Sequence, residues 1–265
     1  MSSWRLDLSY IGHHYSGWQS QSDGNAIQDH MQKALKILLR EDVKVQGASR
    51  TDTGVHAQQQ VAVFHTHKDV DPYRMLPSLN ALLPDGVAVR SIRETEIDFH
   101  PAFRAKAKVY RYRLWKGRCH EAFYQPWVWS MPFEVDVEGL KKEAQHCVGR
   151  YDFTSFCNRD STAKTRTRTV LDIHIEDCGP LVNVWVLGEG FLKQMVRILV
   201  GTLVDRCRGH LKTEIPYILE QKDRRQAGVT APACGLSLVE LYYDDIATIA
   251  DVIERQKQGL TMSVP

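Results

Sequence analysis

The length, composition and charge of the chain exclude several classes of protein. With 265 residues it can form one large domain or two modest ones, each with a buried core. Hydrophobic residues make up 43% and charged residues 25%, as in soluble globular proteins, which excludes an intrinsically disordered chain. No apolar run approaches the roughly eighteen residues of a membrane span, and no basic patch precedes an apolar run near Met1, so we expect a cytoplasmic protein.

The first hundred residues alternate between strand patterns and helix patterns. Apolar and polar residues alternate along 4–11, which predicts a strand, and 43–46, 57–65 and 86–92 are further expected strands. Apolar residues recur at helical spacing in 25–41 and 73–83, and Asn25 is the expected N-cap of the first helix. The run Pro84-Asp85-Gly86 predicts a turn before the last of these strands.

Asp52 lies in a loop between two of these expected strands, beside Arg50 and Gly54. A carboxylate on a loop at the rim of a sheet is a common place for a functional group. The same residue types also form Asx turns, in which the side chain bonds the local backbone. The pattern alone therefore favours a structural turn over a functional aspartate.

The second half repeats this alternation. Strand patterns cover 106–115, 168–175, 181–187 and 236–243, and helical patterns cover 137–148, 191–207 and 215–221. The chain therefore predicts an α+β fold with two similar α/β halves, 1–105 and 106–265, which no Pro/Gly/Ser-rich linker separates. We expect their sheets to join into one central sheet with helices packed on it, and a basic cleft between the halves.

The strand at 106–115 interleaves cations with phenol rings. A period of two places Lys106, Lys108, Tyr110 and Tyr112 on one face. Aromatic rings stack on nucleobases, and lysines beside them bind phosphates. Tyrosines in strands more often pack in a core or across strands. The lysine companions argue against a dry core here.

Arg197 lies among apolar residues in the expected helix 191–207. One turn further along, its face continues with Gly201 and Val204 rather than with charges. A buried guanidinium needs a carboxylate, such as Asp52, or backbone acceptors, because an unpaired buried charge is costly. The alternative is that Arg197 reaches solvent beside Lys193. The sequence leaves both readings open.

Two short segments concentrate positive charge, although the net charge is only +2. The first holds seven basic residues and no acidic one, and the second holds four basic residues against Asp160. One such run is usually a solvated face, but two runs with aromatic residues inside them favour a polyanionic partner. The basic residues are Arg104, Lys106, Lys108, Arg111, Arg113, Lys116 and Arg118 in the first segment, and Arg159, Lys164, Arg166 and Arg168 in the second.

Metal and cofactor chemistry have no support in the sequence. The six cysteines lack the two-residue spacing of zinc and redox motifs, so we expect reduced and mostly buried thiols. No further ligand stands at metal-binding spacing from His13 and His14, and no glycine-rich phosphate loop occurs. We therefore expect no metal and no cofactor. The cysteines are Cys119, Cys147, Cys157, Cys178, Cys207 and Cys234.

Several ordered motifs together resemble the TruA family of pseudouridine synthases over nearly the whole chain. The matching runs are YSGWQ at 15–19, RTDTGVHA at 50–57, LNALLP at 79–84, FHPAF at 99–103, YRY at 110–112, DFTSF at 152–156, MVR at 195–197 and GL at 235–236. The chain departs from the usual GRTDAGVH pattern of the family at Ser49 and Thr53. The arginine and the aspartate of that pattern are in place.

The resemblance implies a role for each of five residues. Asp52 would be the nucleophile that isomerises uridine to pseudouridine, attacking either the sugar or the uracil ring. Arg197 would pair with Asp52, and Tyr110 would stack on the flipped uracil. Arg50 would help to hold the extruded nucleotide, and Leu236 would line the uracil pocket. Lys106, Lys108, Arg166 and Arg168 are further candidates for contacts with RNA.

The same resemblance implies a bacterial-type homodimer that modifies uridines 38, 39 and 40 in the anticodon stem-loop of tRNA. The motifs are compatible with two alternatives. One is a catalytically idle tRNA-binding or chaperone-like module, and the other is a eukaryotic-type member that modifies other tRNA uridines. A hydrolase with an aspartate nucleophile is disfavoured, because no metal site or second catalytic carboxylate can be assigned.

Overall fold

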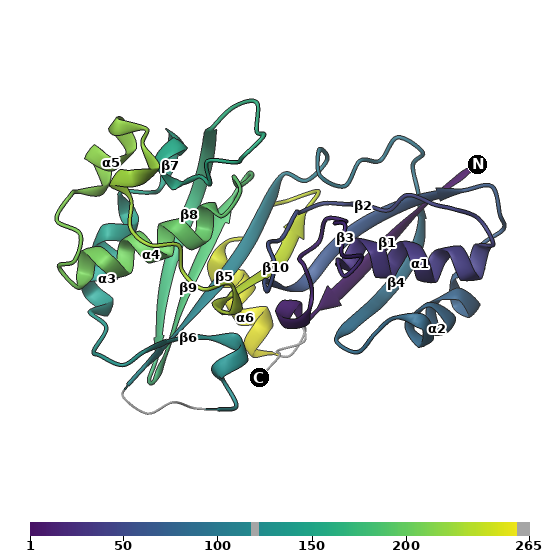
Figure 1. The fold of residues 1–265 in the computed structure, drawn as a ribbon, viewed down its shortest axis with the longest axis horizontal. Helices are drawn as coiled ribbons and strands as arrows, with labels where there is room; N and C mark the ends of the chain where they lie inside the picture. The colour runs from purple at the N-terminus through teal and green to yellow at the C-terminus, as the bar shows by residue number, and fades with distance from the viewer. Residues whose placement is uncertain (118–121, 259–265) are drawn as a thin grey trace. The chain divides into compact units, whose positions relative to one another are not determined.

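The computed structural model of the protein describes residues 1–117 and 122–258. Over these residues the strands form one mixed sheet in the order β4-β1-β3-β10-β5-β9-β8-β7, with β2 paired to β3 and β6 paired to β5 (Figure 1). Helices accompany the sheet, so the predicted α+β fold with one central sheet is confirmed. The chain divides into two compact units.

The first unit contains Met1–Lys106 and Leu238–Asp244. Its central strand, β1 (Ser2–Tyr10), is antiparallel to both β3 (His56–Thr66) and β4 (Val87–Thr95). Successive side chains of a strand point to opposite faces, and Leu6 and Leu8 of β1 are fully buried, so they form part of the apolar face of this sheet. The remaining elements of the unit are α1 (Ile27–Leu39), α2 (Pro72–Leu82), β2 (Gln46–Gly47) and most of β10 (Leu236–Tyr242).

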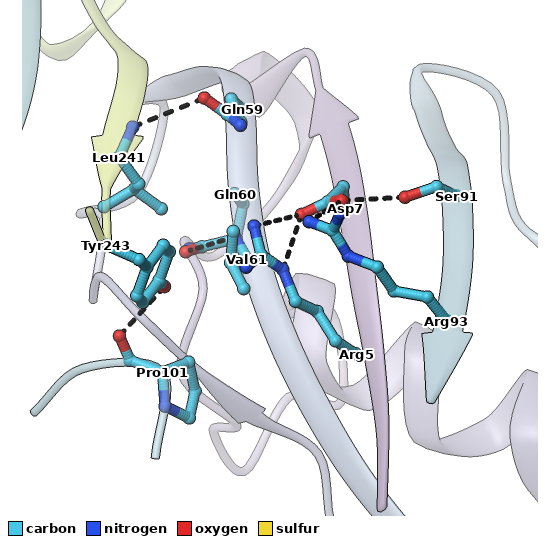
Figure 2. A network of polar contacts seen from close by, with 10 residues as sticks. All are labelled: Arg5, Asp7, Gln59, Gln60, Val61, Ser91, Arg93, Pro101, Leu241 and Tyr243. Carbon is cyan, nitrogen blue, oxygen red and sulfur yellow. Dashed lines mark hydrogen bonds and ion pairs between the residues drawn. The ribbon is translucent and has the colours of Figure 1, made fainter. Parts of the chain in front are cut away.

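The other face of β1 carries the polar network of Figure 2. The Asp7 carboxylate accepts hydrogen bonds from the Arg5 guanidinium, from Ser91 Oγ at 2.7 Å and from Arg93 Nη2 at 3.0 Å. The Arg5 guanidinium also lies 4.7 Å from the ring centre of Tyr243, whose hydroxyl donates to the carbonyl of Pro101 at 2.9 Å. These contacts link β1, β4 and the segments around Pro101 and Tyr243.

The second unit contains Ala107–Ser237 and residues 245–258 of the described chain. Its strands β5 (Ala107–Lys116), β9 (Leu181–Gly188), β8 (Thr167–Cys178) and β7 (Gly149–Asp152) are antiparallel neighbours, whereas β6 (Trp129–Met131) runs parallel to β5. Its helices are α3 (Val137–Gln145), α4 (Met195–Cys207), α5 (Ile215–Gln221) and α6 (Ile249–Lys257). The expected second half contains all of β10, but Leu238–Tyr242 of this strand belong to the first unit.

Most expected elements are present, but two details in the first unit were wrong. The N-cap of α1 is Ala26 rather than Asn25, and the side chain of Asn25 donates instead to the carbonyl of His14 at 2.8 Å. The strand expected at 43–46 shrinks to Gln46–Gly47. Side chains of α1 bond the backbone of Val45 in place of a neighbouring strand, because Gln28 donates to its carbonyl and Gln32 accepts from its amide.

The second unit differs from expectation at the start of α4, which begins at Met195 rather than Phe191. Gln194 has a left-handed backbone with a φ of 62°, so the chain enters the helix only after this residue. Strands β6 and β7 and helix α6 were not predicted. The two strands are three and four residues long and carry little periodic signal, whereas Ile249, Val252 and Ile253 of α6 stand at helical spacing that was missed.

The basic run at 104–118 is not one charged surface, contrary to expectation. Arg104 pairs with Glu96 and Asp98, and Lys116 pairs with Asp177 at 2.7 Å. Arg111 and Arg113 are buried, and burial lowers the pKa of Arg111 to about 9. Lys106 is exposed, Lys108 is largely buried, and Arg118 lies outside the described residues.

The cysteines are also less buried than expected. All of those in the described chain are free, but only Cys147 and Cys157 are buried. Cys178 is exposed, Cys207 and Cys234 are partly exposed, and Cys119 lies outside the described residues. Among the helices of residues 1–117 and 122–258, none has the length and apolar character needed to cross a membrane.

Candidate active site

The Asp52 loop connects β2 to β3 and turns at Gly54, whose φ is +82°. The amide of Val55 donates to the carbonyl of Asp52 at 3.1 Å, which closes the turn. A glycine adopts this positive φ without the steric penalty that a Cβ atom imposes. Asp52 is partly exposed and Arg50 is exposed, whereas Ser49, Thr51 and Val55 are buried. The loop therefore presents its two charged side chains and buries Thr51, the residue between them.

A second loop, 11–18, packs directly against the Asp52 loop. The amide of Trp18 donates to the carbonyl of Thr51 at 3.1 Å, and the amide of Gly12 donates to His56 Nδ1 at 3.1 Å. A Cβ atom on Gly17 would lie 2.5 Å from the Thr51 carbonyl oxygen, and one on Gly12 would overlap the Val55 carbonyl. Both glycines are therefore required by a close backbone approach.

Tyr110 stands on β5, paired in register with Val186 of β9. Its side chain is 6% exposed, and the ring of Phe191 meets it edge to face with centres 5.2 Å apart. Tyr112 on the same face is fully buried and donates its hydroxyl to the Pro232 carbonyl at 2.8 Å. The expectation of a wet face is therefore wrong at Tyr112, because Tyr112 packs in the core.

Arg197 lies in the first turn of α4. Its Nε donates to the carbonyl of Ala231 at 2.8 Å, and the amide of Ala231 donates back to the Arg197 carbonyl at 3.1 Å. The sequence left a carboxylate or backbone acceptors open as partners of this guanidinium, and the Ala231 carbonyl is one such backbone acceptor. Gly201, one turn on, packs so closely on the Val229 carbonyl that a Cβ atom would overlap it. The pairing of Arg197 with Asp52 stays a prediction.

The remaining candidates lie near the starts of β5, β8 and β10. Arg168 on β8 donates through Nη1 to the carbonyls of Thr165 and Thr167, while Arg166 is partly exposed just before the strand. Burial, with a contribution from the nearby Arg168 charge, lowers the pKa of Lys108 to about 8. Leu236 begins β10 and is 6% exposed. Their roles in binding RNA or uracil stay predictions.

Sequence patterns did not identify the residues that hold the candidate site in place. Gly12 and Gly17 stand in a loop where any turn would use glycine, and Phe191 was assigned to the helix rather than to a contact with Tyr110. Tyr10 and Gln60 were assigned only to strands. The motif at 15–19 was a usable signal for the packing loop. In the described part of the chain, no group of three or more His, Cys, Asp or Glu side chains could hold a metal ion.

Residues 8–104 and 144–244 match the sequence model of the tRNA pseudouridine synthase family, so the chain belongs to this family. Both matched segments include candidate residues: Asp52 lies in the first, and Arg197 and Leu236 lie in the second. Tyr110 falls between them.

Among its relatives, the chain is similar to proteins named tRNA pseudouridine synthase A. It is 39% identical to that of Acetivibrio thermocellus over 244 residues, which cover 92% of this chain and all of the relative. It is 38% identical to that of Pelobacter propionicus, with 92% and 100% coverage, and 38% identical to that of Bacillus licheniformis, with 91% and 99% coverage. The chain therefore spans essentially the full length of these synthases.

Proposed function

We propose that the protein acts on tRNA as a pseudouridine synthase of the synthase A type, with Asp52 as its nucleophile. The observation that carries the proposal is the family match, which includes the exposed Arg50 and the partly exposed Asp52 on one braced loop. Full-length relatives named tRNA pseudouridine synthase A support the same reaction and substrate class.

The reaction is an isomerisation that consumes no other reactant. The bond between C1′ of the ribose and N1 of uracil breaks, and a bond between C1′ and C5 forms. N1 gains a proton, and C5 loses one to solvent. A carboxylate nucleophile divides this exchange into two easier steps by holding either the sugar or the uracil ring covalently in between. Both points of attack are compatible with Asp52.

The other candidate residues would bind and orient the extruded uridine. Extruding a base costs a few kcal/mol of stacking, which a preformed aromatic surface offsets. In this proposal the ring of Tyr110 is that surface, and Leu236 lines the uracil pocket. Arg50 would help to hold the extruded nucleotide. Arg197 would pair with the Asp52 carboxylate and keep it oriented for attack.

The substrate would be the anticodon stem-loop of tRNA, at uridines 38, 39 and 40. Lys106, Lys108, Arg166 and Arg168 would bind its phosphates, which predicts that tRNA affinity falls steeply with added salt. We further propose that the protein acts in the cytoplasm as a homodimer. Light scattering on the purified protein tests the dimer, and a mass of one chain at micromolar concentration would rule it out.

The decisive experiment measures tritium release from tRNA that carries tritium at C5 of uridine. Wild type should release tritium, whereas Asp52→Asn should release none and still bind tRNA. Asp69→Asn, which changes an exposed carboxylate of the same unit, is the matched control and should behave as wild type. If the wild-type protein binds tRNA but releases no tritium, the proposed enzymatic activity is wrong and the tRNA-binding module is favoured.

A further inference from the structure

A buried side chain is the hydrogen-bonding partner of Ser49, near the start of the Asp52 loop. Gln60 on β3 is fully buried. Its Oε1 accepts from the amide of Ser49 at 3.1 Å, and its Nε2 donates to the carbonyl of Ser49 at 2.7 Å. One amide side chain thus satisfies both backbone groups of Ser49, as a neighbouring strand would. The backbone is fixed at the residue before Arg50.

The same network fixes a second point of the loop, the residue before Asp52. Tyr10 Oη and Thr51 Oγ1 lie 2.8 Å apart, and both side chains are buried. Gln60 Nε2 also donates to Tyr10 Oη, at 3.4 Å, which joins the two fixed points into one network. The loop backbone is therefore held on both sides of Arg50 by hydroxyl and amide groups that come from β1 and β3.

We propose that Tyr10 and Gln60 are positioning residues for Asp52. This inference rests on the proposed function, because it concerns the placement of the proposed nucleophile. With the Ser49 backbone and the Thr51 side chain held, the chain leading into Asp52 has less freedom to shift. A displaced reacting group loses rate steeply even when it is still present. Neither residue would contact the substrate, so their loss should lower kcat and leave tRNA binding unchanged.

The test compares two tyrosines of the first unit. Tyr10→Phe removes the hydroxyl that contacts Thr51. Tyr243→Phe removes a hydroxyl that donates to the Pro101 carbonyl instead of to a residue of the loop (Figure 2). Tritium release by Tyr10→Phe should show a kcat at least about tenfold lower with a KM for tRNA within about twofold of wild type. Tyr243→Phe should keep the wild-type kcat. Equal kcat for both variants would overturn the proposal.

Two Thr51 variants separate positioning from general destabilisation. Thr51→Ser keeps the hydroxyl that contacts Tyr10 and should restore most of the kcat that Thr51→Val loses. Adding Thr51→Val to Tyr10→Phe should cost little more than either change alone, because both break the same contact. Losses that simply multiply would contradict a shared network.

A readout that does not depend on activity separates this inference from the proposed function. Amide hydrogen exchange at residues 49–55 should quicken in Tyr10→Phe and stay at the wild-type rate in Tyr243→Phe. If wild type releases no tritium, the proposed enzyme fails while hydrogen exchange still decides whether Tyr10 holds the loop. Unchanged exchange in Tyr10→Phe would overturn the positioning role even in an active enzyme.

Discussion

The two units hold their candidate residues by different physical means. In the first unit, directional hydrogen bonds and two glycine contacts fix the backbone of the Asp52 loop. In the second, Tyr110 is fixed by strand register and the edge of Phe191, whereas Arg197 combines hydrogen bonds to Ala231 with close packing of its helix at Gly201. Hydrogen bonds of fixed geometry are lost all at once, whereas packing contacts weaken in proportion to the area removed. Substitutions should therefore have sharper effects around Asp52 than around Tyr110.

The largest effect is expected from Gly17→Ala in the first unit. Gly17 has a φ of +83°, and the new Cβ atom would lie 2.5 Å from the Thr51 carbonyl oxygen. The Asp52 loop must move to relieve this overlap, so activity should fall on the order of 100-fold. The free energy of unfolding should fall by about 3 kcal/mol. Tritium release and thermal unfolding measure the two effects.

Gly24→Ala is the matched control for this substitution. Gly24 also has a positive φ, +65°, but no atom lies within 4 Å of its added Cβ position. The change should therefore cost only the left-handed backbone penalty, about 1 kcal/mol, and leave activity near that of wild type. An equal loss of activity in both variants would show that the contact between the loops does not matter.

A smaller effect is expected from Gly201→Ala in the second unit. The new methyl group would overlap the carbonyl of Val229, in the segment whose Ala231 bonds Arg197. The overlap should cost about 2 kcal/mol of stability and lower activity roughly tenfold by displacing Arg197. Gly139→Ala in α3 is the control, because the nearest atoms to its added Cβ belong to the side chain of Asp136, the N-cap of α3, rather than to a backbone carbonyl. A similar activity loss in the control would count against local displacement.

A smaller loss of activity should follow Phe191→Leu in the second unit. Leucine keeps an apolar side chain against Tyr110 but removes the edge-to-face contact at 5.2 Å. Such a contact contributes about 1 kcal/mol beyond burial, which corresponds to roughly fivefold in activity. Phe133→Leu, which removes the ring beneath Arg208, is the control and should leave tritium release unchanged. A drop as large as that of Gly17→Ala would contradict the contrast between the units.

The sequence predicts the longer strands of both units well, because alternation of apolar and polar residues reports the burial of a whole face. Periodicity in β1, β3, β5 and β9 locates each strand to within about a residue or two. The ends of α1 and α4 were less predictable. They depend on single contacts, such as the bond from Asn25 to His14 and the left-handed backbone of Gln194.

The candidate residues themselves came from motifs, but their supports did not. Gln60 lies in a strand whose pattern indicates only burial, and nothing local shows that its amide bonds Ser49 across eleven residues. The buried Arg111 and the core Tyr112 were misjudged for a related reason, because charge and aromatic content do not report which side of a sheet is covered. Contacts between segments distant in sequence decide both cases.

The smallest expected effect is a dependence of tRNA affinity on pH, which would come from Lys108 in the second unit. Its pKa of about 8 means that roughly 90% of its ammonium groups are charged at pH 7 and roughly 10% at pH 9. Because phosphate binding needs the charged form, tRNA affinity should fall severalfold across this interval as pH rises. Lys108→Arg stays charged and should flatten this dependence, while Lys106→Arg, at an exposed lysine, should retain it. If all three proteins lose affinity in parallel, the titrating group lies elsewhere, and Lys108 contributes packing rather than charge to the second unit.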